Sequence, residues 1–167
     1  MGLFDFLKSK PEPAQLTFPA QLGAAAKGCF VPMGQIPDEM FSTGILGVCC
    51  GIEPDEGTVY APIDGKISQL TETRHAVGLE CGGIDVLLHV GVDTVEMKGD
   101  GFFTTVKEGQ AVKKGDVLLT MDLGKIRAAG HPSTVIMAVT NSDDFSNVET
   151  VAQDRVQPGD CVLKVCK

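Results

Sequence analysis

Two histidines carry most of the chemistry that this sequence can offer. His75 lies in the segment R-H-A-V-G-L-E, and His89 lies fourteen residues later in L-L-H-V-G-V-D. Two neutral imidazoles on one surface suit three kinds of chemistry: binding a metal ion, moving a proton, or carrying a phosphoryl group on a ring nitrogen. The choice among them depends on whether the fold brings the two rings together.

His89 interrupts a segment that alternates as a β-strand does. The alternate positions from 84 to 92 are all apolar and define a core face: Ile84, Val86, Leu88, Val90 and Val92. The opposite face carries Asp85, Leu87, His89, Gly91 and Asp93. The imidazole is therefore predicted on a mixed outer surface of the sheet and not in the core.

The glycine pair in E-C-G-G-I-D predicts a hairpin between the two histidine segments. A three-residue loop, 81–83, would set His75 directly opposite His89, with Cβ atoms about 4.5 to 5.5 Å apart. A two-residue Gly82–Gly83 turn would shift the register by one and place the rings on opposite faces. The pairing of the histidines is therefore expected to require a loop of odd length.

Zinc and serine chemistry fit the sequence less well. A catalytic zinc site uses three protein ligands, but there is no H-E-x-x-H segment, and the third histidine, His131, precedes Pro132 in a loop-like stretch. No serine occupies the G-x-S-x-G turn of an activated nucleophile. No metal ligand is predicted, and a zinc-dependent peptidase on a related β fold is kept as an alternative.

The histidines must be positioned by short strands and tight turns. Twenty glycines and nine prolines accompany turn signals every eight to twelve residues from about residue 20 onward. The segments V-K-K-G-D-V-L-L-T-M (112–121) and V-Q-P-G-D-C-V-L-K-V (156–165) repeat one pattern 44 residues apart. We expect an all-β, antiparallel β-sandwich or barrel-like fold with a duplicated half. Short helical turns are also expected, the clearest at N-S-D-D, capped by Asn141 or Ser142.

Charge and hydropathy exclude several classes of function. The formal net charge of −8 opposes a nucleic-acid backbone, so no nucleic-acid partner is expected. No apolar run approaches the roughly 20 residues of a membrane span, and no cleavable leader is recognisable. The six cysteines form no C-x-x-C pair and are expected to be reduced and mostly packed. These features predict a cytoplasmic protein.

Residues 1–19 are predicted to be an N-terminal tail and linker ahead of a domain spanning 20–167. The segment M-G-L-F-D-F-L-K-S-K has apolar residues at helical spacing, followed by lysines. A helix this short needs a membrane surface or a partner to become stable. Weak contact of residues 1–9 with the inner face of a membrane and an untethered tail both stay open.

In several segments, the chain resembles the glucose-type IIA domain of the bacterial phosphoenolpyruvate-dependent sugar phosphotransferase system. These segments occur in the family's order: I-P-D-E-M-F-S-T-G-I-L-G, E-P-D-E-G-T-V-Y-A-P-I-D-G-K-I, R-H-A-V-G-L-E, L-L-H-V-G-V-D-T-V-E-M-K-G-D-G-F, V-K-E-G-Q-A-V-K-K-G-D-V-L-L and M-A-V-T-N. The pattern H-x-G-[IV]-D-T-V-x-[LM]-x-G-x-G-F, which begins at His89, is especially specific.

The resemblance implies a phosphocarrier without a cofactor. His89 would accept a phosphoryl group from the phosphohistidine of the carrier HPr and pass it to a cysteine of a IIB domain in a IIBC sugar permease. His75 would stay unphosphorylated and hydrogen-bond the transferred group, while Thr73 would help to orient it. The family fold, an antiparallel β-sandwich with a duplicated half, agrees with the internal repeat.

A docking rim for these partners is predicted around the histidines. Val77, Leu79 and Leu87 follow from the three-residue loop. Phe41, Asp38 and Asp93 follow from the resemblance, and the two carboxylates could equally be solvated or turn-capping groups. Val90 is included although its position in the strand places it on the core face.

Two alternative functions are compared with the phosphocarrier role. A biotinyl or lipoyl carrier domain would have a similar turn pattern, but it exposes a lysine flanked by methionines, whereas Lys125 lies in L-G-K-I-R. A regulatory protein that only docks enzymes or transporters is compatible with phosphoryl transfer, because the resemblance implies such partners in some bacteria.

Overall fold

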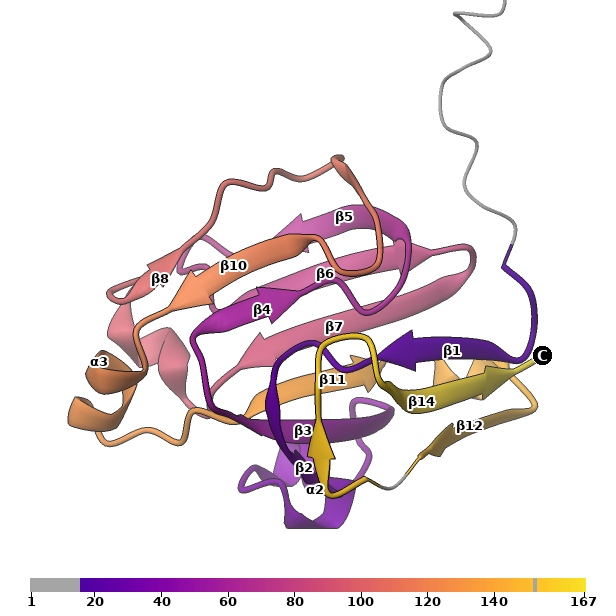
Figure 1. Cartoon of the computed structure of the whole chain (residues 1–167), viewed down its shortest axis with the longest axis horizontal. Coiled ribbons are helices and arrows are strands. Elements are labelled where there is room, and N and C mark those ends of the chain that lie inside the picture. Colours follow the sequence, from indigo (N-terminus) through magenta and orange to yellow (C-terminus); the bar gives the residue numbers. More distant parts are fainter. Residues whose placement is uncertain (1–15, 152) are drawn as a thin grey trace, which may run out of the picture.

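The computed structural model describes residues 16–151 and 153–167, which form layers of antiparallel β-strands (Figure 1). The strands are β1 (Ala20–Gly23), β2 (Gly28–Val31), β3 (Val48–Pro54), β4 (Thr58–Tyr60), β5 (Gly65–Leu70), β6 (Ala76–Cys81), β7 (Ile84–Val90), β8 (Phe102–Phe103), β9 (Ala111–Val112), β10 (Val117–Met121), β11 (Val135–Val139), β12 (Asn147–Thr150), β13 (Arg155–Val156) and β14 (Cys161–Cys166). The helices are α2 (Glu39–Ser42) and α3 (Leu123–Ala128), with 3-10 turns η1 (Met33–Gln35), η2 (Thr94–Met97) and η3 (Ser142–Asp144).

One large sheet and two small sheets make up the β structure. The large sheet has eight strands in the order β13-β2-β3-β11-β7-β6-β5-β9, and the small sheets have the orders β1-β14-β12 and β4-β10-β8. Every pairing is antiparallel. The prediction of an antiparallel β-sandwich is confirmed.

The strand orders show that the fold is duplicated. The eight-strand order reads the same from either end if β13 matches β9, β2 matches β5, β3 matches β6 and β11 matches β7. The same correspondence relates the two small sheets to each other. Strands β4 to β10 therefore form one half, which we call the continuous half, and β1 to β3 with β11 to β14 form the other, which we call the split half.

The repeated sequence V-x-x-G-D makes the same turn in both halves. The Asp116 side chain accepts from the backbone N–H of Lys113 at 2.9 Å, and the Asp160 side chain accepts from Gln157 at 2.8 Å. Each turn has a glycine, Gly115 or Gly159, at φ 93°, which a residue with a Cβ adopts only with strain. The repeat seen in the sequence is therefore a structural repeat.

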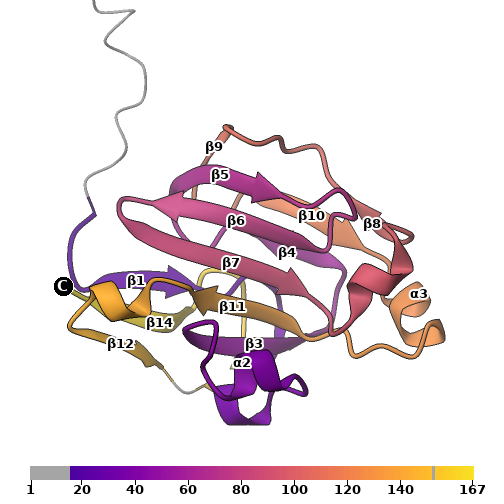
Figure 2. The same cartoon turned by 180° about the vertical axis from the view of Figure 1, so that it is seen from behind.

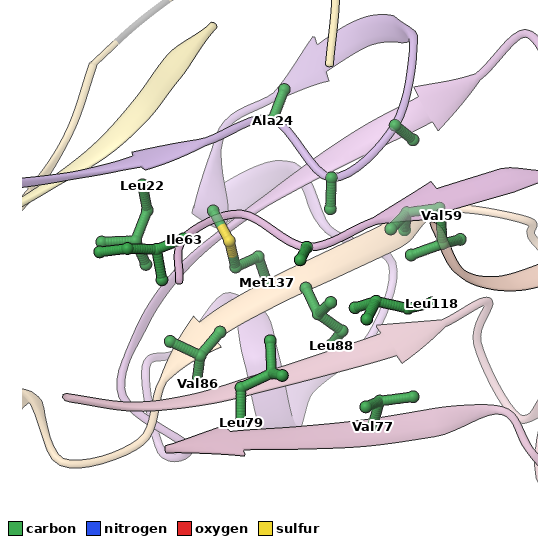
Figure 3. Packing of buried hydrophobic residues seen from close by; sticks show 14 of the residues in the cluster. Leu22, Ala24, Val59, Ile63, Val77, Leu79, Val86, Leu88, Leu118 and Met137 are labelled. Carbon is green, nitrogen blue, oxygen red and sulfur yellow. The ribbon is translucent and has the colours of Figure 1, made fainter. Parts of the chain in front are cut away.

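The main core lies between the inner face of the large sheet and the two small sheets. Figure 3 shows side chains from several strands meeting there, including Leu22, Val59, Leu88, Leu118 and Met137. Fully burying a leucine or valine contributes about 1.5 to 3 kcal/mol relative to exposure. The apolar positions of β7 predicted from the alternation, Ile84, Val86, Leu88 and Val90, are all buried in this core.

A second, smaller apolar cluster covers the outer face of the large sheet. The segment between β2 and β3 contains η1 and α2 and lies against β3 (Figure 2). Its apolar side chains also pack against residues of β11 and β7. The buried members of the cluster are Ile36, Phe41, Cys49, Val92, Ile136 and Ala138. Because His89 points to the same outer face, this cluster forms the surroundings of the histidine.

The loop between β6 and β7 has two residues and not three. Cys81 pairs with Ile84, and the turn residues Gly82 and Gly83 have φ values of 60° and 96°. Positive φ at both positions is what the commonest two-residue hairpin turn requires. The predicted register is wrong: Ala76, and not His75, lies opposite His89.

The helical turns were only partly anticipated. N-S-D-D forms the 3-10 turn η3, but α3 was not expected. Asp122 caps α3 by accepting from the backbone N–H of Lys125 at 3.1 Å, so an N-cap signal was present. No helix among the described residues is both long and apolar enough to cross a membrane. The predicted tail lies almost wholly outside the described residues, so the 1–19 and 20–167 division stays a prediction.

Candidate functional site

The two predicted histidines lie side by side despite the different register. Their ring centroids are 5.0 Å apart, and the rings meet edge to face. His75 is buried, with 7% of its surface exposed, whereas His89 is half-buried. The rings therefore share one patch at the end of β7.

His75 reaches this patch because it lies outside the regular strand. β6 begins only at Ala76, and the preceding residue, Arg74, has φ 59° in the left-handed region. The His75 carbonyl accepts from the backbone N–H of Val90 at 2.7 Å, so the turn stays beside the end of β7. The strict alternation of faces applies to extended strands, and for this reason it did not predict the position of His75.

His89 is held by a backbone carbonyl two residues further on. Its Nδ1 lies 2.8 Å from the carbonyl oxygen of Gly91. Since a carbonyl only accepts, Nδ1 must carry the proton. In the neutral ring, Nε2 then has the free lone pair and is the nucleophilic atom.

His75 is held by a threonine hydroxyl. The Oγ1 atom of Thr73 lies 2.6 Å from His75 Nδ1, and Oγ1 of Thr71 lies 3.4 Å from the same nitrogen. Thr71 also accepts from the backbone N–H of Ala76 at 3.3 Å, which ties the turn to the start of β6. The predicted contact between Thr73 and the site is therefore present, with Thr71 as an additional neighbour.

Burial keeps both imidazoles neutral near pH 7. It lowers the pKa of His75 from 6.5 to about 4, with a smaller contribution from the neighbouring His89. Burial also lowers the pKa of His89, opposed by the bond to the Gly91 carbonyl and by the charges of Asp38 and Asp93. A neutral ring is the form that can attack phosphorus.

Phe41 packs directly against His89, with ring centroids 5.2 Å apart. It lies on α2, a single turn that begins with Asp38, whose carboxylate accepts from the Met40 backbone N–H at 2.9 Å. The Cys49 thiol donates to the Phe41 carbonyl at 3.2 Å from β3 below. Burial raises the pKa of this thiol to about 11, so Cys49 is a packed thiol and not a reactive one.

The predicted docking rim is partly wrong. Val77, Leu79 and Val90 have 1% or less of their surface exposed and belong to the main core, as Figure 3 shows for the first two. With the two-residue turn, Val77 and Leu79 pair with the core residues Leu88 and Val86 and face the core. Val90 lies on the apolar face of β7. Leu87 is half-buried and packs against the outer cluster, so it does lie on the histidine face.

The two predicted carboxylates both act on His89 through their charge. Asp38 is half-buried and caps α2, which fits the turn-capping reading, while its charge also acts on His89. Asp93 is exposed, with φ 60°, and makes no capping bond to η2. Both therefore influence the electrostatics of His89.

Three exposed apolar side chains on the segments around the site were missed. Met40 has 47% of its surface exposed, Ile45 67% and Val95 52%. Met40 is next to Phe41, Ile45 follows α2, and Val95 lies in η2 beyond Asp93. Met40 and Ile45 lie in I-P-D-E-M-F-S-T-G-I-L-G and Val95 lies in the histidine pattern, so apolar residues in two loop-like segments were the available signal.

The alternatives gain no support from these positions. Among the described residues, no group of three histidine, cysteine, aspartate or glutamate side chains is placed to hold a metal ion. Lys125 lies within α3 and pairs with Asp100 at 2.8 Å, so it is not the lysine of a hairpin tip. The reading as a biotinyl or lipoyl carrier is therefore wrong.

Known proteins similar to this chain include both fused and free-standing ones. The β-glucoside-specific EIIBCA component of Dickeya chrysanthemi is 43% identical over 123 residues, which cover 73% of this chain and 20% of that protein. The glucose-specific EIIA component of Bacillus cereus is 39% identical over 128 residues, 76% of this chain and 78% of that protein. The chain thus spans about a fifth of the fused relatives.

A solved structure and a family pattern agree with these relatives. Glucose permease IIA from Mycoplasma capricolum superimposes with a TM-score of 0.78 at 31% identity, covering 86% of this chain and 94% of that one. Residues 20–145 match the family described as phosphoenolpyruvate-dependent sugar phosphotransferase system, EIIA 1. With the fold, the paired histidines and these matches in agreement, the chain belongs to that EIIA family.

Proposed function

We propose that this protein is a phosphocarrier of a sugar phosphotransferase system that holds the phosphoryl group on Nε2 of His89. The main supporting observation is the bond between His89 Nδ1 and the Gly91 carbonyl, which leaves Nε2 free. Membership of the EIIA family supports the phosphocarrier role in general. The atom, the donor and the acceptor are our assignments.

In the first step, the donor is a phosphohistidine of an HPr-type carrier. The lone pair on Nε2 of His89 attacks phosphorus, a new P–N bond forms, and the P–N bond to the donor imidazole breaks. Nδ1 keeps its proton, and its bond to Gly91 stabilises the positive charge that develops on the ring. In the second step, a cysteine thiolate of a IIB domain attacks phosphorus and the P–Nε2 bond breaks.

His75 is assigned to binding the transferred phosphoryl group. If the Thr73 hydroxyl donates to His75 Nδ1, the proton of the neutral ring lies on Nε2 and can be donated to a phosphoryl oxygen. The low pKa of His75 keeps this arrangement neutral at pH 7. Such a donor, fixed before the reaction, stabilises the charge that builds up in the transition state.

The partners are assigned to the surface around His89. Exposed Met40, Ile45 and Val95 supply apolar contact, while Asp38 and Asp93 supply negative charge. A donor and an acceptor with apolar patches bordered by basic residues would fit this surface. The fused relatives, whose names combine EIIA with EIIB and EIIC, support a IIB domain as one of these partners.

The test is phosphorylation by a defined donor. The protein, Enzyme I, HPr and phosphoenolpyruvate are incubated together, and the modified residue is mapped by mass spectrometry under conditions that preserve phosphohistidine. We expect one phosphoryl group on His89 and none in His89→Gln. Phosphorylation of His89→Gln at the wild-type rate, or no phosphorylation of the folded wild type, would contradict the proposal.

A further inference from the structure

Thr94 is buried, yet it lies among groups that act directly on His89. None of its surface is exposed, and its hydroxyl donates to the backbone carbonyl of Val90. Val90 and Thr94 are the two ends of the short loop that follows β7. The hydroxyl therefore closes this loop from inside the protein.

The methyl group of Thr94 packs against the second residue of the same loop. A Cβ added to Gly91 would lie 2.4 Å from Thr94 Cγ2, so the threonine occupies the space beside the Gly91 backbone. The backbone N–H of Gly91 donates to the Thr134 carbonyl at 2.7 Å. The backbone of Gly91 is thus held by Thr134, the residue before β11, and by Thr94.

The carbonyl that determines the protonation of His89 belongs to the next peptide group, between Gly91 and Val92, whose N–H donates to the Pro132 carbonyl at 3.0 Å. Gly91 has φ 78° and Asp93 has φ 60°, so two of the three residues enclosed by the loop are left-handed. A non-glycine residue in this region is strained and persists only where its surroundings fix it. A loop that loses its internal hydrogen bond can relax, and the Gly91 carbonyl would then move away from His89 Nδ1.

We propose that Thr94 is a positioning residue which, by fixing the Gly91 carbonyl, keeps the proton of neutral His89 on Nδ1 and leaves Nε2 as the attacking atom. The part of this inference that concerns reaction rate rests on the proposed phosphocarrier function. The part that concerns the tautomer does not. The substitution Thr94→Val keeps the shape of the side chain and replaces the hydroxyl with a methyl group, whereas Thr94→Ser keeps the hydroxyl and loses the methyl group.

The experiment measures the His89 tautomer and the transfer rate in full-length wild type, Thr94→Val and Thr94→Ser. Long-range proton–nitrogen NMR at pH 8 reports which ring nitrogen carries the proton. We expect Nδ1–H in wild type and Thr94→Ser, and a mixture with Nε2–H in Thr94→Val. With saturating phospho-HPr, Thr94→Val should react about 10-fold more slowly, at unchanged KM, as expected from one lost hydrogen bond.

The outcomes separate a positioning role from a merely structural one. A Thr94→Val protein with the wild-type tautomer and rate, or a Thr94→Ser protein as impaired as Thr94→Val, would overturn the inference. If Thr94→Val does not fold, Thr94→Ala is compared with Thr94→Ser, because these differ by the hydroxyl alone. If the wild type accepts no phosphoryl group but Thr94→Val changes the tautomer, the proposed function fails and the inference about Thr94 stands.

Discussion

The two ends of the central strand pair, β7 and β11, are equivalent in the duplicated fold but use their polar side chains differently. After β7, the chain carries His89 and the loop with Thr94. After β11, the corresponding loop carries Asn141 and Ser142. Both loops adjoin the start of a matching strand, β6 in the continuous half and β3 in the split half.

Polar side chains after β11 are paired with the backbone. Asn141 accepts from the N–H of Asp85 at 2.9 Å and donates to the Gly83 carbonyl at 2.8 Å. Ser142 accepts from the N–H of Val48 at 2.9 Å and donates to the Val139 carbonyl. These contacts satisfy backbone groups where strands end, which is what stability requires there.

At the end of β7, each histidine ring has one nitrogen that is not bonded to its own loop. Within the part of the chain that the structure describes, His89 bonds the Gly91 carbonyl through Nδ1, and His75 bonds Thr73 through Nδ1. One nitrogen of each ring is thus bound to its own loop, and the other is available to a ligand. The duplicated framework thus needs only the pairing seen after β11, whereas the two ring nitrogens left available after β7 are the groups that the proposed function uses.

Among the substitutions at the end of β7, His75→Ala should slow transfer most. Loss of one fixed donor to a developing oxyanion costs about 10²-fold in rate. Phosphoryl transfer from His89 to a IIB domain, measured by rapid quench, should slow by about this factor while His89 is still the modified residue. A transfer rate within twofold of wild type would show that His75 does not donate a hydrogen bond to the transferred phosphoryl group.

A smaller effect is expected for Thr73→Val, which keeps the shape of the side chain and removes its hydroxyl. His75 would then be free to place its proton on either nitrogen, and we expect transfer to slow by about 10-fold, as for one lost hydrogen bond. The same rapid-quench measurement checks this. Thr71→Val is the matched control, because the Thr71 hydroxyl lies 3.4 Å from His75 Nδ1 and should matter less. An equal loss of transfer rate in both variants would contradict the role assigned to Thr73.

Ser142→Ala should affect stability but not transfer. Removing the hydroxyl leaves the backbone groups of Val48 and Val139 without this partner, which costs about 1 to 2 kcal/mol. Urea unfolding followed by circular dichroism measures the change, and the transfer rate should stay within twofold of wild type. A large loss of rate in a folded Ser142→Ala protein would mean that the two ends are not functionally distinct.

An effect on stability of similar size is expected from pH. The pKa of His75 falls from 6.5 to about 4 on folding, so the unfolded chain binds more protons between these values. The stability linked to this shift is present above pH 6.5 and is lost as the pH falls towards 4. Between pH 7.5 and 5.0, wild type should lose about 2 kcal/mol more unfolding free energy than His75→Gln. If urea unfolding shows the same loss of unfolding free energy in wild type and His75→Gln, the lowered pKa of His75 is contradicted.

Local patterns predicted much of the fold. The repeated V-x-x-G-D turns predicted the duplication, and the alternation in 84–90 placed His89 on the outer face. The predicted register between β6 and β7 was wrong, because pairing the histidines requires an odd loop only if His75 lies in the regular strand, and it does not. The glycine pair alone would have indicated the two-residue turn that is present.

The site was predicted in its residue types more than in its contacts. His75, His89 and Thr73 do meet, but through the left-handed Arg74, a conformation that no periodicity indicates. The contact of Phe41 with His89 depends on the segment before β3 folding back over the sheet, a long-range contact that single-sequence patterns do not contain. Thr94 was not recognised although it lies within the histidine pattern, because the sequence does not show that its hydroxyl is buried and bonded to the Val90 carbonyl.

The position of the phosphoryl group on the ring of His89 tests the central claim most directly. The protein, labelled with nitrogen-15 in histidine, is phosphorylated by HPr and studied by phosphorus and nitrogen NMR. We predict phosphorus bonded to Nε2 of His89, with Nδ1 still protonated. Phosphorus on Nδ1 of His89, on His75 or on any other residue would contradict the account.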